Sequence, residues 1–399
     1  MKEKICVMGL GYIGLPTASL LATKGCEVIG VDISASVIET INRGEVHIRE
    51  PELDVLVRSA VSSGNLRAQS EPEPADVFFI TVPTPIGDRG EPDLSYVEAA
   101  TTAIAAHVEP GNLVILESTC PIGTTDNLVA DTLRKLGVDV ESEVNVAHCP
   151  ERVLPGSILT ELVRNDRIVG GVNARATSAA AAFYRQFVSG EVCETTARLA
   201  EMTKLTENTF RDVNIALANE LSIICDHHGI DVWALVKLAN RHPRVSVLQP
   251  GPGVGGHCIA VDPWFVVASA PEHARLIRTA REVNDAKPEW VLEKIRDKAE
   301  RFKRPTIACL GLSFKADVDD LRQSPALHIA QRIVEDDLGN VLVCEPNVDE
   351  IKDFNLVSLD EAITFADIVI LLVKHREFSS LSQNQLKDKI VIDTCNCLL

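Results

Sequence analysis

A glycine-rich loop that ends in a cysteine is the segment of this chain best suited to covalent chemistry. It reads PGPGVGGHC over residues 250–258, and Asp262 follows four positions later. Glycines leave bare backbone against which a ligand can lie, and a cysteine in such a loop is placed for nucleophilic attack. We interpret Cys258 as a candidate nucleophile, with a structural thiol as the alternative.

A polar stripe on a predicted helix supports this interpretation. Lys204, Asn208 and Arg211 follow one another at i, i+4 and i+7, which places them on one helix face. Such a stripe either forms the wall of a cleft for sugar and phosphate or is a solvated face. In the first case Lys204 can take a proton from an alcohol and stabilise an oxyanion.

The segment GLGYIG, residues 9–14, directly follows a predicted strand and opens a predicted helix. Gly9 allows a tight turn, Gly11 lets backbone approach a pyrophosphate, and Gly14 lets helix and strand pack closely. Asp32 ends the next predicted strand, where a carboxylate can bind a ribose hydroxyl. No arginine directly follows Asp32, so we expect NAD rather than NADP. The alternative is a turn that only packs the helix.

Hydroxyl side chains follow two further predicted strands. Thr84 lies in VPTP, and Ser118 and Thr119 lie in ESTCPIGTT. Ligands of open α/β sheets bind beyond the carboxyl ends of the strands, so these hydroxyls can reach a cofactor or substrate. The alternative is that they cap a helix or a turn.

A second loop of this kind, GLSFK over residues 311–315, lacks the glycine fingerprint. Lys315 and Arg322 would suit a diphosphate, as a point charge and a bidentate fork. The alternative is a surface network between these cations and the acidic residues beside them, Asp317, Asp319 and Asp320.

The elements that must position these residues alternate between short β-branched runs and helical stretches in the first half of the chain. The runs are KICVMGL, CEVIGVD, ADVFFITV, NLVILEST and VNVAHCP. TIACLGL, NVLVCEP, ADIVILLV and KIVIDTCN repeat the plan near the end. We predict an α/β fold of two Rossmann-like, doubly wound parallel-sheet domains, residues 1–192 and 304–399, joined by a helical domain, residues 193–303. Chance similarity of generic βαβ patterns is the alternative explanation of the repeat.

Two long helices are expected in the middle domain. One covers Thr196–His228 and stops at Gly229; the other covers Asp285–Lys303, with Pro288 in its first turn. The first is apolar around most of its circumference and must bury more than one face. We therefore expect a homo-oligomer, at least a dimer. The alternative is that the second face packs on the first domain.

Composition excludes several classes of protein. With 39 basic and 57 acidic residues the net charge is −18, which disfavours nucleic acid and membrane surfaces. No run approaches the length of a membrane span, and the first strand does not resemble a signal peptide. The eleven scattered cysteines suit a reducing cytoplasm. We expect no metal, because Cys395-x-Cys397 and His227-His228 have no second ligand pair at zinc spacing.

Taken together, these motifs resemble those of the nucleotide-sugar 6-dehydrogenases, including UDP-glucose and GDP-mannose dehydrogenases. The resemblance covers nearly the whole chain through GLGYIG, VPTP, ESTCPIGTT, CPERVLPG, the Lys204–Asn208 helix, GGHC and GLSFKADVDDLRQSP. It implies two Rossmann-like domains joined by a helical dimerisation region. It also implies two successive oxidations of a sugar alcohol, with two NAD reduced per sugar, through a covalent cysteine intermediate.

The resemblance also implies roles for individual residues. Cys258 would be the nucleophile and Lys204 the proton-transfer residue, supported by Asn208, Asp262, Glu151 and Thr119. Cofactor binding would involve Gly9, Gly11, Tyr12, Ile13, Gly14, Asp32, Thr84, Thr119 and Arg322. Nucleotide-sugar binding would involve Arg152, Val153, Lys204, Asn208, Arg211, Gly255, Phe314 and Lys315, with His242 and Arg244 entering the site of a partner subunit.

Within the family, ANRHPRV, GGHCIAVDPWF and FRDVNIALANEL resemble UDP-N-acetyl-D-mannosamine dehydrogenases. UDP-N-acetylglucosamine 6-dehydrogenases share GGHC with a following DP. The UDP-glucose branch usually has lysines where this chain has Val261 and Asn214. We therefore expect oxidation of UDP-N-acetyl-D-mannosamine to its uronate, with UDP-N-acetylglucosamine and UDP-glucose as alternative substrates.

Two other functions compete with this one. A two-electron NAD dehydrogenase for a hydroxyacid would need no nucleophilic cysteine. A non-catalytic sensor of NAD or nucleotide sugar would need neither Cys258 nor Lys204. The expected yields of NADH per sugar are two, one and none.

Overall fold

The computed structural model describes residues 3–87 and 90–398, and it divides the chain into two compact units, Met1–Glu207 and Asn208–Leu399. The first is called unit 1 and the second unit 2.

Unit 1 is built on an eight-stranded sheet with the order β3-β2-β1-β4-β5-β6-β7-β8. Every neighbouring pair is parallel except β6 and β7, which are antiparallel. The predicted parallel sheet is thus confirmed, with this one exception. The strands are β1 Lys4–Met8, β2 Glu27–Val31, β3 Leu66–Gln69, β4 Val77–Ile80, β5 Leu113–Leu116, β6 Asn145–His148, β7 Arg167–Gly171 and β8 Val192–Thr196.

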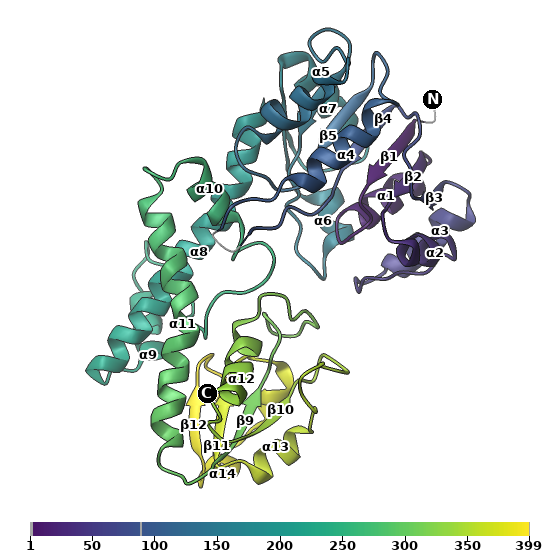
Figure 1. Cartoon of the computed structure of the whole chain (residues 1–399). Helices are drawn as coiled ribbons and strands as arrows, with labels where there is room; N and C mark the ends of the chain where they lie inside the picture. Colours follow the sequence, from purple (N-terminus) through teal and green to yellow (C-terminus); the bar gives the residue numbers. More distant parts are fainter. Residues whose placement is uncertain (1–2, 88–89, 399) are drawn as a thin grey trace. The chain divides into compact units, whose positions relative to one another are not determined.

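Helices cover both faces of this sheet (Figure 1). Ile5 and Val7 of β1 belong to a core with α1, α3 and α7, whereas Cys6 and Met8 belong to a core with α4 and α5. The alternation follows from the two-residue period of a strand. The helices are α1 Gly14–Thr23, α2 Ala35–Asn42, α3 Leu53–Ser62, α4 Ser95–Ala105, a π-helical turn Thr125–Ala130 leading into α5 Asp131–Lys135, α6 Ile158–Arg164 and α7 Ala174–Tyr184.

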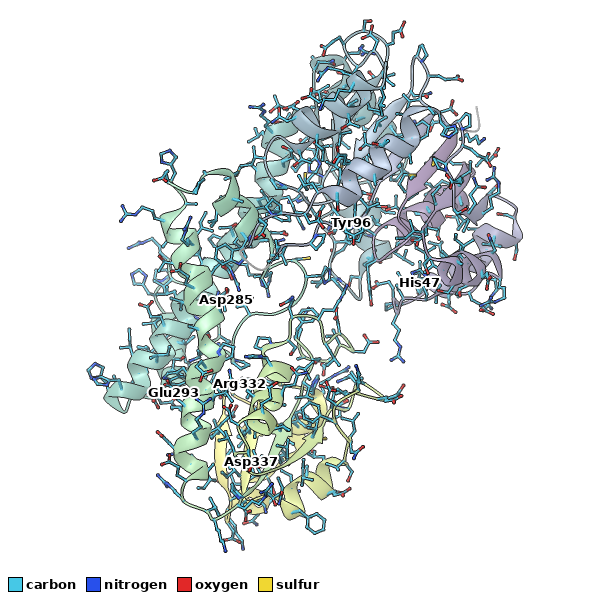
Figure 2. The ribbon with its side chains drawn as sticks, viewed as in Figure 1. His47, Tyr96, Asp285, Glu293, Arg332 and Asp337 are labelled. Carbon is cyan, nitrogen blue, oxygen red and sulfur yellow. The ribbon has the colours of Figure 1, made fainter. Side chains whose placement is uncertain are left out.

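The helix α8, Ala197–His228, begins one residue after the predicted start and ends where predicted, at Gly229 with φ of 66°. α9 Val232–Ala239 and α10 Asp262–Ser269 follow it. α11, Arg275–Ala299, differs from its prediction, because it starts ten residues earlier and carries Pro288 in its interior. Tertiary packing outweighs the tendency of the proline to end the helix. Arg281 is 1 % exposed and forms ion pairs with Asp212 and with Asp285. Asp285 is labelled in Figure 2.

Unit 2 also contains a four-stranded parallel sheet with the order β10-β9-β11-β12. The order matches β2-β1-β4-β5 of unit 1, so the internal repeat is confirmed. The strands are β9 Thr306–Leu310, β10 Asn340–Cys344, β11 Ile368–Leu371 and β12 Ile390–Asp393; α12 Pro325–Glu335, α13 Leu359–Phe365, a 3₁₀ turn Arg376–Ser380 and α14 Gln383–Leu386 complete it. α11 and α12 cover one face, where Arg332 (labelled in Figure 2) lies 3.5 Å from Glu289.

Within the part of the chain that the structure describes, no helix combines the length and apolar character needed to cross a membrane.

Candidate active site

The glycine loop between β1 and α1 has the shape that a dinucleotide requires. Gly9 has φ of 92°, and its N–H donates to the carbonyl of Val31 at 2.8 Å. A Cβ on Gly14 would lie 1.8 Å from the Gly9 carbonyl oxygen, whereas a Cβ on Gly11 would meet no atom within 4 Å. Gly14 is thus needed for packing, and open space lies at Gly11. Tyr12 and Ile13 complete the turn into α1, where the Leu15 N–H donates to the Gly11 carbonyl at 3.1 Å.

Asp32 stands at the end of β2, beside this loop. One carboxylate oxygen accepts from the N–H of Leu10 at 3.0 Å and the other from the N–H of Ser34 at 2.9 Å. A carboxylate accepts about four hydrogen bonds, so Asp32 keeps capacity for a ribose hydroxyl. His47, labelled in Figure 2, is a neighbour that the sequence did not suggest. Burial lowers its pKa, and the charge of Asp32 opposes that shift.

The hydroxyls beyond β4 and β5 donate to backbone carbonyls. The Thr84 hydroxyl donates to the Thr119 carbonyl at 2.6 Å, and the Ser118 hydroxyl donates to the Val82 carbonyl at 2.7 Å. These bonds join the two strand ends. Because a hydroxyl also accepts, Thr84 can still bind a ligand.

Lys204 and Glu151 come together in unit 1. The Lys204 ammonium lies 3.8 Å from a Glu151 carboxylate oxygen, and the two side chains are 8 % and 12 % exposed. The other Glu151 oxygen accepts from the N–H of Val153. Arg152 is fastened nearby by an ion pair of 2.7 Å with Glu207. The structure therefore places a shielded base and acid at one point, from residues far apart in sequence.

In unit 2, Asn208 and Asp262 are brought together. The Asn208 amide donates to the Asp262 carboxylate at 2.5 Å, and Asp262 is 3 % exposed. Asp262 is the first residue of α10, and its N–H donates to the Cys258 carbonyl at 2.8 Å. The half-buried Cys258 thus lies on the turn that leads into Asp262.

The glycines of the 250–258 loop serve mainly to pack the protein against itself. A Cβ on Gly255 would lie 2.4 Å from the Gln323 carbonyl oxygen, and one on Gly256 would lie 2.8 Å from the ring of Phe314. A Cβ on Gly253 would lie 2.9 Å from Pro325. Protein atoms thus occupy the space that a side chain would need at these three positions, which accounts for the glycines by packing.

The altered loop of the second sheet borders a cavity of about 560 Å³. Phe314 and Lys315 line it, together with Gly253 and Lys374. Lys315 is exposed, which leaves its ammonium available for a phosphate. Two of the predicted nucleotide-sugar residues, Phe314 and Lys315, therefore lie at a cavity of a size common for ligand sites.

Glu345 is a site residue that the sequence analysis missed. Its carboxylate accepts from the N–H groups of Leu312 and Ser313 at 2.6 and 3.0 Å and lies 3.1 Å from His375 Nε2. Burial raises the pKa of Glu345, but its hydrogen bonds, first from His375, lower it overall. Glu345 directly follows β10 as Asp32 directly follows β2, and each accepts from a leucine N–H in the loop after the neighbouring strand, β9 or β1. The matched repeats contained this signal.

The remaining predicted site residues do not lie at the cavity. Arg322 forms a 2.6 Å ion pair with Asp320, so part of the expected surface network exists. Arg211, His242 and Arg244 are exposed and are not among the described residues that line the 560 Å³ cavity.

Comparison with known proteins agrees with this geometry. Residues 3–188, 198–286 and 308–399 match the NAD binding, central and UDP binding domains of the UDP-glucose/GDP-mannose dehydrogenase family. The chain belongs to this family. NAD is its cofactor, and the glycine loop and Asp32 fit that cofactor. The chain is an NAD-dependent nucleotide-sugar dehydrogenase.

Several relatives of this family member span nearly its whole length. An NDP-N-acetyl-D-galactosaminuronic acid dehydrogenase of Ralstonia nicotianae is 58 % identical, covering 98 % of this chain and 95 % of the relative. A UDP-N-acetyl-D-mannosamine dehydrogenase of Campylobacter jejuni is 52 % identical, covering 98 % of both. The solved UDP-N-acetyl-mannosamine dehydrogenase of S. aureus has a TM-score of 0.92 and 43 % identity, over 99 % of this chain and 95 % of that one.

Proposed function

We propose that the protein oxidises the C6 alcohol of UDP-N-acetyl-D-mannosamine to the uronate, reducing two NAD per sugar. The pairing of Asn208 with Asp262 on the turn that carries Cys258 is the observation that most supports a covalent route. A single oxidation of an alcohol needs no cysteine at such a turn. The names of the Campylobacter and S. aureus relatives support the sugar.

In the proposed reaction each group of residues has one task. Lys204, as the neutral amine and held by Glu151, takes the proton of the C6 hydroxyl while the first hydride leaves C6, and the thiolate of Cys258 adds to the carbon of the resulting aldehyde. Loss of a second hydride leaves a thioester, and water releases the carboxylate and the thiol. NAD, when bound, accepts the hydride of each oxidation. Asn208 and Asp262 hold the oxyanion and the attacking water.

A second candidate substrate differs from UDP-N-acetyl-D-mannosamine at both C2 and C4 of the sugar. The two Ralstonia relatives, at 58 % and 57 % identity, are NDP-N-acetyl-D-galactosaminuronic acid dehydrogenases. UDP-N-acetylgalactosamine therefore belongs in the test beside the manno and gluco epimers. In each case we propose that the UDP moiety binds beside Phe314 and Lys315.

A panel assay with a matched cysteine control tests this function. Each UDP-sugar is incubated with excess NAD, and NADH and uronate are counted per sugar consumed. We expect two NADH with the preferred sugar and a rate at least tenfold above the other epimers. Cys258→Ser should form no uronate while still binding NAD, and Cys193→Ser, which removes another half-buried thiol, should keep full turnover. Unimpaired uronate formation by Cys258→Ser would refute the covalent route.

We also propose a homo-oligomer formed through α8. Leu199, Phe210, Leu217 and Ile224 are 44–70 % exposed on this one helix, which leaves an apolar surface to be covered. His242 and Arg244, just beyond α9, would then enter a neighbouring subunit's site. Mixing Arg244→Ala with Cys258→Ser subunits should restore activity through hybrids. Confirmed subunit exchange without recovered activity would exclude a shared site.

We infer a cytoplasmic location from the reaction, which draws on NAD and nucleotide sugar. The eleven cysteines, all present as thiols, fit a reducing compartment.

A further inference from the structure

Three buried side chains with metal-ligand chemistry meet at the carboxyl edge of the first sheet. Cys120 follows β5, His148 ends the neighbouring strand β6, and Glu201 lies in the first turns of α8. They are 1 %, 0 % and 1 % exposed. One ligand atom of each lies within 4.8 Å of the others, and the Cys120 sulfur lies 3.8 Å from the nearer Glu201 oxygen.

His148 is the member that packing alone does not explain. Neither ring nitrogen has a hydrogen-bond partner of acceptable geometry, although the side chain is fully buried. Leaving a buried polar group without a hydrogen bond is costly, so such groups are rare without a reason. The neutral imidazole is the form of histidine that binds metals.

Glu201 is already held in place by its surroundings. Its oxygens accept from the N–H of Gly123 at 2.5 Å and from the N–H and hydroxyl of Thr125 at 2.8 and 2.6 Å. Carboxylate ligands of metals are typically fixed by such outer hydrogen bonds. The Leu116 carbonyl, beside His148, is the kind of group to which the second ring nitrogen of a metal-bound histidine donates.

We propose that Cys120, His148 and Glu201 bind one divalent metal ion, and that Zn²⁺ suits them best. Thiolate, imidazole and carboxylate are its usual ligands, and bond lengths of about 2.3 Å to sulfur and about 2.1 Å to oxygen place those two atoms about 3.6 Å apart at the tetrahedral angle. The observed 3.8 Å is close to this distance. One thiolate and one carboxylate neutralise the ion, as a buried site requires.

Binding exchanges one proton for the metal. In the metal-free protein the Cys120 thiol donates to Glu201. The sulfur–metal bond replaces the sulfur–hydrogen bond, the proton leaves to solvent, and no electron moves. A water molecule completes the tetrahedron.

The site would join three segments that carry proposed catalytic residues. Thr119 precedes Cys120, Glu151 lies three residues after His148, and Lys204 lies three residues after Glu201. A metal would therefore hold this edge of unit 1 together without touching the substrate. Its presence is independent of which sugar is oxidised.

The other ligand-type cluster in the described chain lacks these features. In Asp317, His375 and Glu377, both carboxylates are exposed, and the His375 ring already contacts Ser313 and Glu345.

Metal analysis of the full-length protein tests the proposal without reference to activity. Protein from zinc-supplemented growth is dialysed against a weak chelator, and zinc is measured per chain. X-ray absorption then reports the neighbours of the ion. We expect one zinc per chain with a single sulfur at about 2.3 Å and the rest nitrogen or oxygen. The Cys395–Cys397 pair, whose sulfurs are 3.6 Å apart, would instead give two sulfurs.

Substitutions locate the ion. Cys120→Ser and His148→Phe should each weaken zinc binding at least a hundredfold, because each removes a direct ligand. Cys6→Ser, a matched buried thiol in the same unit, should bind zinc as the wild type does, and so should Cys258→Ser and Cys395→Ser. Circular dichroism and NAD binding confirm that each variant is folded.

Three results would overturn the proposal: a dialysed protein that holds less than a tenth of a zinc per chain, a spectrum with two sulfur neighbours, or zinc lost with Cys258 or Cys395 but retained in Cys120→Ser. If Cys120→Ser does not fold, the sulfur count of the wild-type protein still decides between the sites.

Discussion

Adding one methyl group at either of two glycines of the cofactor loop should affect the stability of the fold differently. The fold should become less stable at Gly14, whereas only NAD binding should weaken at Gly11. In Gly14→Ala the new Cβ would lie 1.8 Å from the Gly9 carbonyl oxygen and 2.5 Å from the Thr81 hydroxyl. The carbonyl is backbone, so the start of α1 must move by more than an ångström. That motion disturbs the bonds that the Thr81 hydroxyl donates to the Met8 and Gly9 carbonyls.

The magnitude follows from the cost of overpacking, about 1–3 kcal/mol. For a unit of this size each kcal/mol corresponds to about 2–4 °C, so we expect the melting temperature of Gly14→Ala to fall by about 2–12 °C. NAD binding should weaken as well, because the loop moves.

Gly11→Ala is the matched control, since its Cβ would meet no atom within 4 Å. We expect an unchanged melting temperature but NAD affinity at least tenfold lower, because the methyl group occupies the space that a pyrophosphate needs. Scanning calorimetry measures the first quantity and isothermal titration with NAD the second. Normal stability of Gly14→Ala, or normal NAD affinity of Gly11→Ala, would refute the reasoning.

Three further predictions concern other parts of the chain. Asp32→Ala should weaken NAD binding about ten- to a hundredfold by titration, because a charged hydrogen-bond acceptor is lost; an unchanged dissociation constant would remove Asp32 from the site. Burial lowers the pKa of Lys287 to about 7, so between about pH 7 and 10 the unfolded chain binds a proton that the folded chain does not. The free energy of unfolding should therefore rise over that pH range. The rise should be about 5 kcal/mol at most, because the ring of Trp290 favours the charged form of Lys287. Lys287→Met should remove this rise, as measured by denaturant titrations at several pH values. Phe210→Glu, at a side chain 70 % exposed on α8, should lower the mass seen in sedimentation, whereas an unchanged oligomer would place the interface elsewhere.

Local sequence patterns predicted much of the fold. The runs that became β1, β2, β4, β5 and β6 are short and β-branched, and their counterparts in the repeat became β9 to β12. The sequence analysis did not predict the strands β3, β7 and β8, because they are polar or end in glycines. Their register also depends on neighbouring strands already in the sheet. The true start of α11 was not predicted for a similar reason. The buried contacts of Arg281 stabilise this helix, although Pro288 in its interior is unfavourable for a helix.

The sequence by itself determined the dinucleotide loop and the repeat of the two sheets, because each depends on residues a few positions apart or on a periodic pattern. Only the tertiary structure decided that Glu345 holds the altered loop and that the glycines of the Cys258 loop face protein atoms. It also decided the meeting of Cys120, His148 and Glu201, which lie 28 and 53 positions apart. Neighbouring parallel strands bring their carboxyl ends to one edge through long crossovers, and no spacing in the sequence records which side chains then touch.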